Sequence, residues 1–250
     1  MSVIERVKQK ECSYGLNISL MDPTILEIAA QAGIHFVRLD CEHILFNPET
    51  IARMLQVGRL LGLDVQVRVP SLNNVTALLD MGASAIMVPH IESKEDALKA
   101  VQVIKYPPLG DRGLTGAARV LGFGRLNVKE YQRTANENVL FIAQIESKKG
   151  MENIDEILSV EGLDMVATGR NDLSQSLGMP GDKNHPKVLE AEEFIIRKTV
   201  SYGKIPTILC KNPTRRKQLY ELGVRCFSIA RDDSLLKTAL QGQLEKLTME

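Results

Sequence analysis

The sequence predicts an α/β fold, a (β/α)8 TIM barrel that forms a single domain over residues 1–250. Short apolar runs alternate with longer amphipathic segments eight times, and the runs are apolar on both faces, as in a parallel sheet covered by helices. A chain of 250 residues also suits one closed barrel. An open dinucleotide-binding sheet is disfavoured because the turn after the first strand, LMDPT, contains no glycine.

The order of the elements follows from these apolar runs. We expect strands at residues 15–20, 35–40, 64–68, 84–88, 139–145, 163–168, 205–209 and 224–229. We expect helices at about 2–10, 23–33, 48–61, 73–81, 93–104, 147–159, 186–202, 213–221 and 232–247. The longest irregular stretch, 106–135, follows the fourth strand, and loops of that length are uncommon unless they are functional or disordered.

Proline and glycine mark several helix ends. Pro23 and Pro213 stand at the favoured first helical position, after Asp22 and Asn212. The phrases AAQAGIHFVRLD, LLDMGASAIMVP and LYELGVRCFSIA are three versions of one helix–glycine–strand unit, in which the glycine ends the helix. This repetition supports the alternation of strands and helices.

The composition argues against several classes of protein. The formal net charge is zero, which gives no support for a nucleic-acid or membrane surface. The four cysteines are scattered without CxxC or Cys/His spacing, so reduced thiols in a cytoplasm are expected rather than a zinc or disulfide framework. The N-terminus MSVIERVKQK lacks the apolar centre of a signal peptide, and no apolar run approaches membrane-spanning length.

Polar residues gather where the predicted strands end. Active sites of barrels lie at the carboxyl ends of the strands, so these residues are the candidate site. They are Asp40, Glu42, His43, Arg68, His90, Gln144, Glu146, Arg170, Asn171, Asp172 and Lys211. A purely structural barrel would not need so many charges at one rim.

Glu146 and Asp172 end adjacent strands, so their carboxylates are expected to approach one another. Two carboxylates that leave other coordination positions of a metal open suit Mg²⁺ or Mn²⁺, whereas a carboxylate pair without a metal can act as an acid and a base. The residues alone leave these two roles level. A third interpretation is that Asp172 caps a helix within GRNDLSQSL.

Three basic residues have competing interpretations. Arg68, charged inside the apolar strand VQVRVP, can either pair with a structural carboxylate or bind a substrate oxyanion, and we favour the latter. His43, three residues after Asp40, is a candidate general base or a plain polar residue. Lys211 is a candidate for a Schiff base, although an exposed loop position explains it better.

Over about residues 14–240, the sequence resembles the HpcH/HpaI aldolase family of metal-dependent class II pyruvate aldolases. The resemblance is carried by DPTILEIAAQAG, LDCEH, VRVP, LLDMGASAIMVPHIES, YPPLGDRG, AQIES, VEGLDMVATGRNDLSQSLG and ELGVRCFSIARDD, in this order. It implies reversible aldol cleavage of a 4-hydroxy-2-oxo acid to pyruvate and an aldehyde.

The resemblance also implies roles for individual residues. Glu146 and Asp172 match the two ligands of a divalent cation, Mg²⁺ or Mn²⁺, with Co²⁺ and Zn²⁺ as further candidates. Arg68 matches the arginine that stabilises the enolate, and His43 with Asp40 matches the pair used in proton transfer. The pocket for the pyruvyl group matches Gln144, Gly169, Asn171 and Leu209.

The resemblance further implies a homo-oligomer, usually a hexamer. Asp80 of LLDMG matches an acid presented across a subunit interface, and the C-terminal helix at 232–247 is expected to pack on a neighbouring subunit. The chain departs from the family pattern at Arg170, which could favour an acidic substrate tail or pair with Glu42, and at Ile44-Leu45-Phe46. The rival hypotheses are a citrate-lyase-like acyl-CoA lyase, a non-catalytic binding barrel and a Schiff-base aldolase.

Overall fold

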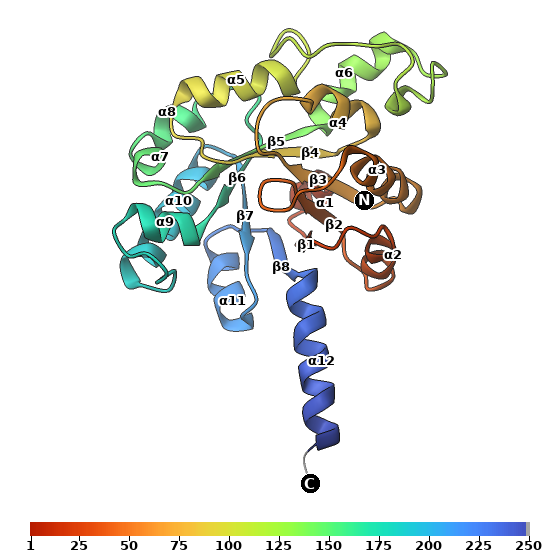
Figure 1. Ribbon diagram of the computed structural model, residues 1–250. Coiled ribbons are helices and arrows are strands. Elements are labelled where there is room, and N and C mark those ends of the chain that lie inside the picture. Colours follow the sequence, from red (N-terminus) through yellow and green to blue (C-terminus); the bar gives the residue numbers. More distant parts are fainter. Residues whose placement is uncertain (249–250) are drawn as a thin grey trace.

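The eight apolar runs form one closed parallel barrel within residues 1–248, which are the residues that this computed structural model describes (Figure 1). The strands pair in chain order and β8 closes on β1. They are β1 (Ser13–Ile18), β2 (Phe36–Asp40), β3 (Asp64–Arg68), β4 (Ala85–Val88), β5 (Leu140–Ile145), β6 (Met165–Thr168), β7 (Ile205–Leu209) and β8 (Cys226–Arg231). The predicted fold class is therefore confirmed. Residues 249 and 250 of the predicted domain lie outside the described residues.

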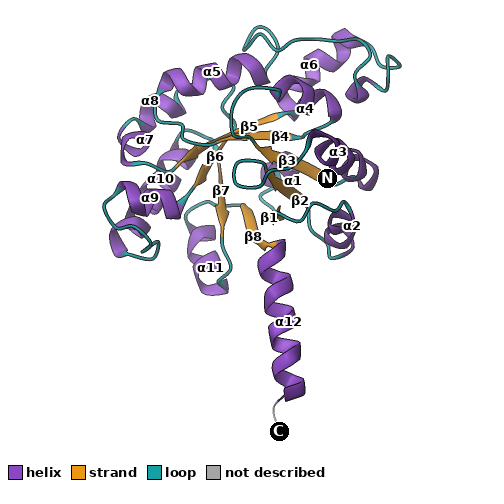
Figure 2. Ribbon diagram, viewed as in Figure 1, coloured by secondary structure: helices purple, strands orange, loops and turns teal. Residues whose placement is uncertain are grey.

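Helices surround the barrel (Figure 2). They are α1 (Val3–Lys8), α2 (Thr24–Gln31), α3 (Pro48–Leu61), α4 (Val75–Met81), α5 (Lys94–Ile104), the short 3-10 helix η1 (Arg119–Leu121), α6 (Val128–Asn138), α7 (Lys148–Glu152), α8 (Ile154–Leu158), α9 (Arg170–Ser176), α10 (Pro186–Ser201), α11 (Pro213–Glu221) and α12 (Asp232–Thr248). Most of them cover the outer faces of the strands, whereas α1 lies at one end of the barrel and α12 projects away from it. Among the helices of residues 1–248, none combines the length and apolar character that crossing a membrane requires.

Three segments differ from the prediction. The segment 106–135, predicted to be irregular, contains η1 and the start of α6, because the Asn127 side chain accepts hydrogen bonds from two backbone N–H groups of the first turn. The helix predicted at 147–159 is broken at Asn153, whose backbone leaves helical geometry and whose amide donates to the carbonyl of Glu92. The short helix α9, absent from the prediction, follows β6 directly.

The barrel interior is filled by an apolar cluster at its lower end, the end opposite the strand carboxyl termini. Buried side chains from five strands and from α1 form this cluster, which includes Val3, Phe36, Ala85, Leu140 and Met165. A capping box of Ser2 and Glu5 holds α1 in place. Val3 therefore closes the end of the barrel that faces away from the strand carboxyl termini.

A buried ion pair connects the segment after α5 to β5 and β6. Lys105, whose side chain is 1% exposed, donates to Asp164 at 2.8 Å and to the carbonyls of Asn136 and Val139 at 2.8 and 2.6 Å. Asp164 also accepts from the backbone N–H of Phe141 at 2.7 Å. Burial raises the pKa of the Asp164 carboxyl, and the charge of Lys105 opposes this shift. Lys105 thus supplies the positive charge that balances the buried Asp164 carboxylate.

We predict that Lys105→Met destabilises the protein by about 3 kcal/mol, because it leaves a largely buried carboxylate without its cation. Chemical denaturation measures this loss. Lys148→Met is the matched control: Lys148 is 62% exposed and lies 3.7 Å from Glu152, so its loss should cost less than about 0.5 kcal/mol. Equal effects of the two substitutions would contradict the structural role of Lys105.

Candidate active site

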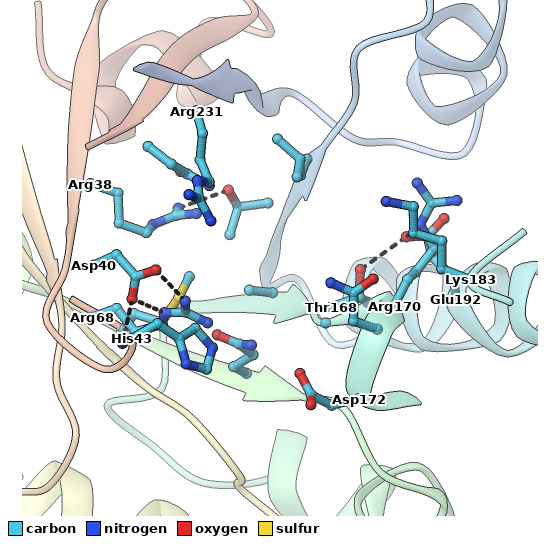
Figure 3. A pocket seen from close by; sticks show the side chains of 18 residues that line it. Arg38, Asp40, His43, Arg68, Thr168, Arg170, Asp172, Lys183, Glu192 and Arg231 are labelled. Carbon is cyan, nitrogen blue, oxygen red and sulfur yellow. Dashed lines mark hydrogen bonds and ion pairs between the residues drawn. The ribbon is translucent and has the colours of Figure 1, made fainter. Parts of the chain in front are cut away.

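A cavity of about 230 Å³ opens at the carboxyl ends of the strands, where the sequence places the candidate site (Figure 3). Eight of the ten residues to which the resemblance assigns a role line it: Asp40, His43, Arg68, Gln144, Gly169, Asn171, Asp172 and Leu209. Glu146 lies beside Gln144, to which it is hydrogen bonded. The barrel therefore brings together side chains from β2, β3, β5, β6 and β7.

Glu146 directly follows β5 and is 3% exposed. Its Oε1 accepts a hydrogen bond from the backbone N–H of His90 at 3.0 Å, and its Oε2 accepts from the amide of Gln144. Burial raises the pKa of the Glu146 carboxyl, and the charge of Asp172 raises it further, against the two hydrogen bonds. The carboxylate is thus held in place but lacks a full counter-charge.

Gly169 allows Glu146 to take this position. A Cβ at residue 169 would overlap Oε2 of Glu146 and would lie 2.9 Å from the amide nitrogen of Gln144. Real Cβ atoms essentially never lie this close to other atoms, so a side chain at residue 169 would displace the Glu146 carboxylate. Its role here is steric.

Asp172 lies in the first turn of α9 and is exposed to the cavity. The N-cap residue that precedes α9 is Gly169, and no side chain caps the helix there, so helix capping does not explain Asp172. Within residues 1–248 no group of three or more His, Cys, Asp or Glu side chains is placed to share a metal ion. The donor chemistry of Glu146 and Asp172 nevertheless fits a hard divalent cation, for which water and substrate oxygens would supply further ligands.

Arg68 is held by two carboxylates at the end of β3. Its Nε and one terminal nitrogen donate to the two oxygens of Asp40 at 3.0 and 2.7 Å, and the other terminal nitrogen lies 3.0 Å from Glu42 Oε2. Burial pushes the pKa of the Asp40 carboxyl upward, but the hydrogen bonds and charge of Arg68 outweigh it and the pKa is lowered. The guanidinium is therefore fixed in orientation while it still lines the cavity.

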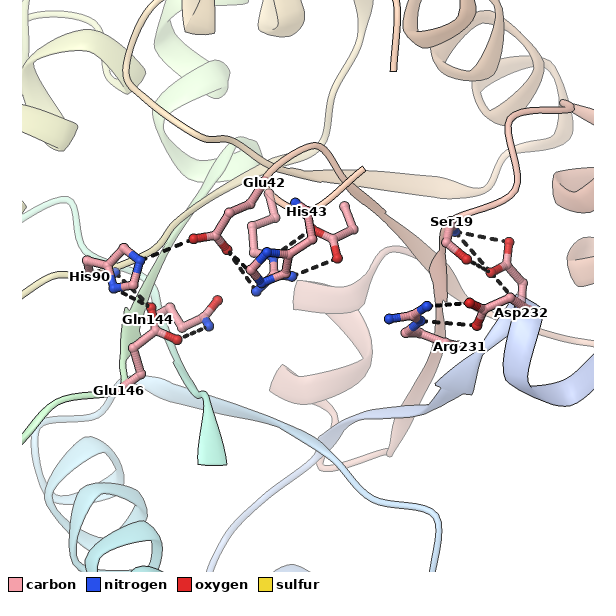
Figure 4. A network of polar contacts seen from close by, with 11 residues as sticks. Ser19, Glu42, His43, His90, Gln144, Glu146, Arg231 and Asp232 are labelled. Atoms are coloured by element: carbon pink, nitrogen blue, oxygen red, sulfur yellow. Dashed lines mark hydrogen bonds and ion pairs between the residues drawn. The ribbon is translucent and has the colours of Figure 1, made fainter. Parts of the chain in front are cut away.

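Two histidines contact Glu42 (Figure 4). The His43 ring lies 3.7 Å from Glu42, whereas Asp40 accepts from the His43 backbone N–H at 3.3 Å. In this structure Asp40 bonds to the His43 backbone and to Arg68, and the His43 imidazole lies beside Glu42. His90 lies between Glu42 and Glu146, at 3.2 and 3.1 Å, and its backbone has a positive φ of 54°.

The remaining predicted residues lie elsewhere. Asp80, near the end of α4, accepts from the buried Arg112 at 2.7 Å and does not line the cavity of its own chain. Lys211 donates to Ser234 at 3.1 Å, away from the cavity lining. Arg170 lies 3.4 Å from Glu192 on α10 and so does not pair with Glu42.

The cavity also contains residues that the sequence analysis did not single out. They are Asn17, Arg38, Met87, Ala167, Thr168, Lys183, Glu192, Thr207 and Arg231. Arg38 carries the same signal that identified Arg68, a charge inside an apolar strand, in HFVRLD. Glu192 carries no such signal, because a glutamate in an amphipathic helix is ordinary and only the packing of α10 buries it.

A family model described as HpcH/HpaI aldolase/citrate lyase matches residues 13–236. The chain belongs to this family. It is 34% identical over 242 residues to a hydroxypyruvate/pyruvate aldolase of Pseudomonas aeruginosa, covering 95% of this chain and 89% of that protein. It is 31% identical over 243 residues to the 2-keto-3-deoxy-L-rhamnonate aldolase of Escherichia coli K12, covering 96% and 90%.

The fold agrees with a solved member of the family. The crystal structure of an HpcH/HpaI aldolase from Desulfitobacterium hafniense DCB-2 matches with a TM-score of 0.93 and 30% identity, covering 100% of this chain and 98% of that one. The family resemblance seen in the sequence is therefore confirmed over nearly the whole chain.

We predict that Gly169→Ala weakens Mn²⁺ binding about 10- to 100-fold, because the added methyl group displaces the Glu146 carboxylate. Isothermal titration with Mn²⁺ measures the change. Gly116→Ala is the matched control, since a Cβ at Gly116 meets no atom within 4 Å. Unchanged affinity in Gly169→Ala would show that the position of Glu146 does not matter for the metal.

Proposed function

We propose that this chain is a carbon–carbon lyase, a class II pyruvate aldolase that reversibly cleaves a 4-hydroxy-2-oxo acid to pyruvate and an aldehyde. The observation that carries the proposal is the arrangement of Glu146 and Asp172 at the ends of adjacent strands, beside a cavity that Arg68 also lines. Membership of the aldolase family and the names of both relatives support the same reaction.

Glu146 and Asp172 are proposed to hold Mg²⁺ or Mn²⁺, with Co²⁺ and Zn²⁺ as further candidates. When bound, such a cation supplies positive charge for the oxygens of a 2-oxo acid and for the enolate that cleavage leaves. Gln144, Gly169, Asn171 and Leu209 are proposed to surround the pyruvyl group, and all four line the cavity. The Gln144 amide, which donates to Glu146, would orient the ligand as well as the substrate.

Arg68 is proposed to stabilise the negative oxygen that develops during cleavage. Its guanidinium is already oriented by Asp40 and Glu42, so little reorganisation is needed when the charge appears. Asp40 acts by fixing Arg68 and the His43 backbone. This preorganisation is the main contribution of β2 and β3 to the reaction.

His43 is proposed to accept the proton of the 4-hydroxyl group. The imidazole is exposed, lines the cavity and lies 3.7 Å from the Glu42 carboxylate, within reach of a bound substrate. As the bond between C3 and C4 breaks, its electron pair stays on C3, and C4 becomes the carbonyl carbon of the aldehyde. Protonation at C3 then completes pyruvate.

We predict that the protein exchanges the methyl protons of pyruvate with solvent when Mg²⁺ or Mn²⁺ is present, because this exchange needs only the enolate half-reaction. NMR in D₂O measures it. Glu146→Gln and Asp172→Asn should each slow the exchange more than about 100-fold, since each removes a ligand charge.

Lys211→Met is the matched control, because it alters a strand-end residue outside the cavity lining. Loss of exchange in this variant, or trapping of pyruvate by borohydride, would favour the Schiff-base aldolase instead. Absence of exchange in the unmodified protein with every divalent metal tried would overturn the proposal and favour a binding barrel. The family name also covers citrate lyases, so cleavage of a citryl thioester is the alternative that the same preparation can test.

The proposed assembly is a homo-oligomer, a hexamer by resemblance, and α12 supports it. Figure 1 shows α12 projecting away from the barrel, and its side chains at Leu236, Leu240, Leu244 and Leu247 are 51–76% exposed. Their spacing places them on one face of the helix. A second copy of the chain would cover this face, and Asp80 is proposed to serve a neighbouring subunit.

We predict that the double substitution Leu240→Lys and Leu244→Lys shifts the protein to a smaller species, because it places charges in the proposed contact. Light scattering after size-exclusion chromatography measures the mass. Lys237→Glu and Lys246→Glu on the same helix form the control pair. A monomeric unmodified protein would contradict the proposed assembly.

The cysteines are free thiols in the described residues, which supports the proposed cytoplasmic location.

A further inference from the structure

A second buried carboxylate, that of Glu192, lies at the edge of the candidate site. Glu192 belongs to α10, and its side chain is 2% exposed although it lines the cavity. Figure 3 shows it gathered with Thr168 and Arg170, apart from Asp40 and Arg68. Burying a carboxylate is costly unless charged and hydrogen-bonding partners balance it. The reaction proposed above gives this residue no part, so its presence in the cavity wall needs an explanation.

The Glu192 carboxylate contacts three neighbouring elements. Its Oε1 accepts a hydrogen bond from the hydroxyl of Thr168, at the end of β6, at 3.1 Å. The same oxygen lies 3.4 Å from Nε of Arg170, the first residue of α9. Its Oε2 accepts from Arg215, on α11, at 3.1 Å. One buried side chain thus connects α10 to β6, α9 and α11.

Two of these contacts flank Gly169. Thr168 precedes the glycine and Arg170 follows it, and both contact the same oxygen of Glu192. The backbone of Gly169 lies so close to the Glu146 carboxylate that a Cβ would overlap it. Glu192 therefore restrains the chain on both sides of the residue against which the first candidate metal ligand packs.

The first turn of α9 presents the second candidate ligand, Asp172. No side chain of the described residues caps this helix, and Asp172 is exposed, so buried packing begins only at Leu173. An uncapped first turn is less stable than a capped one. The ion pair between Arg170 and Glu192 is thus the contact that restrains the start of α9.

Glu192 also balances charge beside the candidate metal site. Arg170, at which the chain departs from the family pattern, brings a positive charge two residues from Asp172. A positive charge at this range disfavours a bound cation. Arg215, the other partner of Glu192, also donates to Glu193 at 2.7 Å. The two arginines and two glutamates of this cluster therefore sum to zero charge.

We propose that Glu192 is a positioning residue of the metal site. Through Thr168 and Arg170 it holds the segment 168–172 in the arrangement in which the two candidate carboxylates share one cation, and it cancels the charge of Arg170 beside them. Glu192 acts through these residues and is not itself a ligand. The inference rests on the proposed metal-dependent function and adds a residue of α10 to it.

A purely structural role for Glu192 would be to join α10 to α11 through Arg215. The neighbouring residue Glu193 already makes this connection, and among the described residues it has no hydrogen bond or ion pair with Thr168 or Arg170. Glu193→Gln is therefore the matched control. It perturbs the same arginine but leaves the contacts on both sides of Gly169 in place.

The first test measures the affinity of the metal-free protein for Mn²⁺ by titration calorimetry. Glu192→Leu should weaken Mn²⁺ binding about tenfold or more, the usual cost of losing a residue that orients a metal ligand. Glu192→Gln keeps an oxygen that accepts from Thr168, so its affinity should lie between the two. Glu193→Gln should bind Mn²⁺ as the unmodified protein does. Equal affinity in Glu192→Leu and the unmodified protein would overturn the inference.

Loss of stability is separated from loss of positioning by Lys105→Met. This substitution is expected to destabilise the fold but lies outside the cavity lining, so it should leave Mn²⁺ affinity unchanged. A Glu192→Leu protein that is destabilised yet keeps its affinity would show a structural role only. If Glu192→Leu does not fold, Glu192→Gln and Thr168→Val decide, since each removes part of the restraint and should weaken binding.

The second test requires no metal. Hydrogen exchange followed by mass spectrometry reports how firmly residues 169–173 are held. In Glu192→Leu these amides should exchange roughly fivefold faster or more, because the contacts on both sides of Gly169 are lost, whereas Glu193→Gln should leave them unchanged. Unchanged exchange in Glu192→Leu would show that Glu192 does not hold this segment.

Failure of the proposed function gives a different pattern of results. If the unmodified protein neither binds Mn²⁺ nor exchanges the methyl protons of pyruvate, the metal-dependent function and the role of Glu192 in it are both wrong. If the unmodified protein does both, and Glu192→Leu binds Mn²⁺ equally well, only the role of Glu192 is wrong.

Discussion

The close approach of the Glu146 carboxylate to the backbone of Gly169 is the constraint on which the candidate site depends. It lies where β5 and β6 end, and it leaves space for no side chain at residue 169. Gln144 and His90 hold the carboxylate from two sides, and α9 begins directly after Gly169 and presents Asp172. Two carboxylates are thereby brought to one edge of the barrel by local packing, even though their mutual repulsion opposes it.

Much of the fold could be predicted because its signals are local. Alternating apolar runs and glycine-terminated helices are visible in any short window of the sequence, and they are enough to order eight strands. The break at Asn153 and the helix α6 could not be predicted, because a contact with the Glu92 carbonyl and a cap at Asn127 decide them. Short-range patterns do not carry such contacts.

The candidate site, like the fold, was predictable only in part. Strand-end position identified Glu146, Asp172 and Arg68 as candidates, since the carboxyl ends of parallel strands must meet. It could not show that Arg68 donates to both oxygens of Asp40, or that the His43 ring lies beside Glu42. Arg38 was missed for a different reason. The sequence shows a charge inside an apolar strand, but Arg38 lies two residues before the end of β2 and so was not counted among the strand-end residues.

The sealed lower end of the barrel has a consequence for how ligands come and go. Val3 and the apolar cluster around it fill the interior below Arg38, so the cavity has a floor as well as a mouth. Two fragments produced in such a space cannot leave by opposite routes. The one nearer the mouth has to depart first, and the order of release is then set by depth in the barrel rather than by affinity alone.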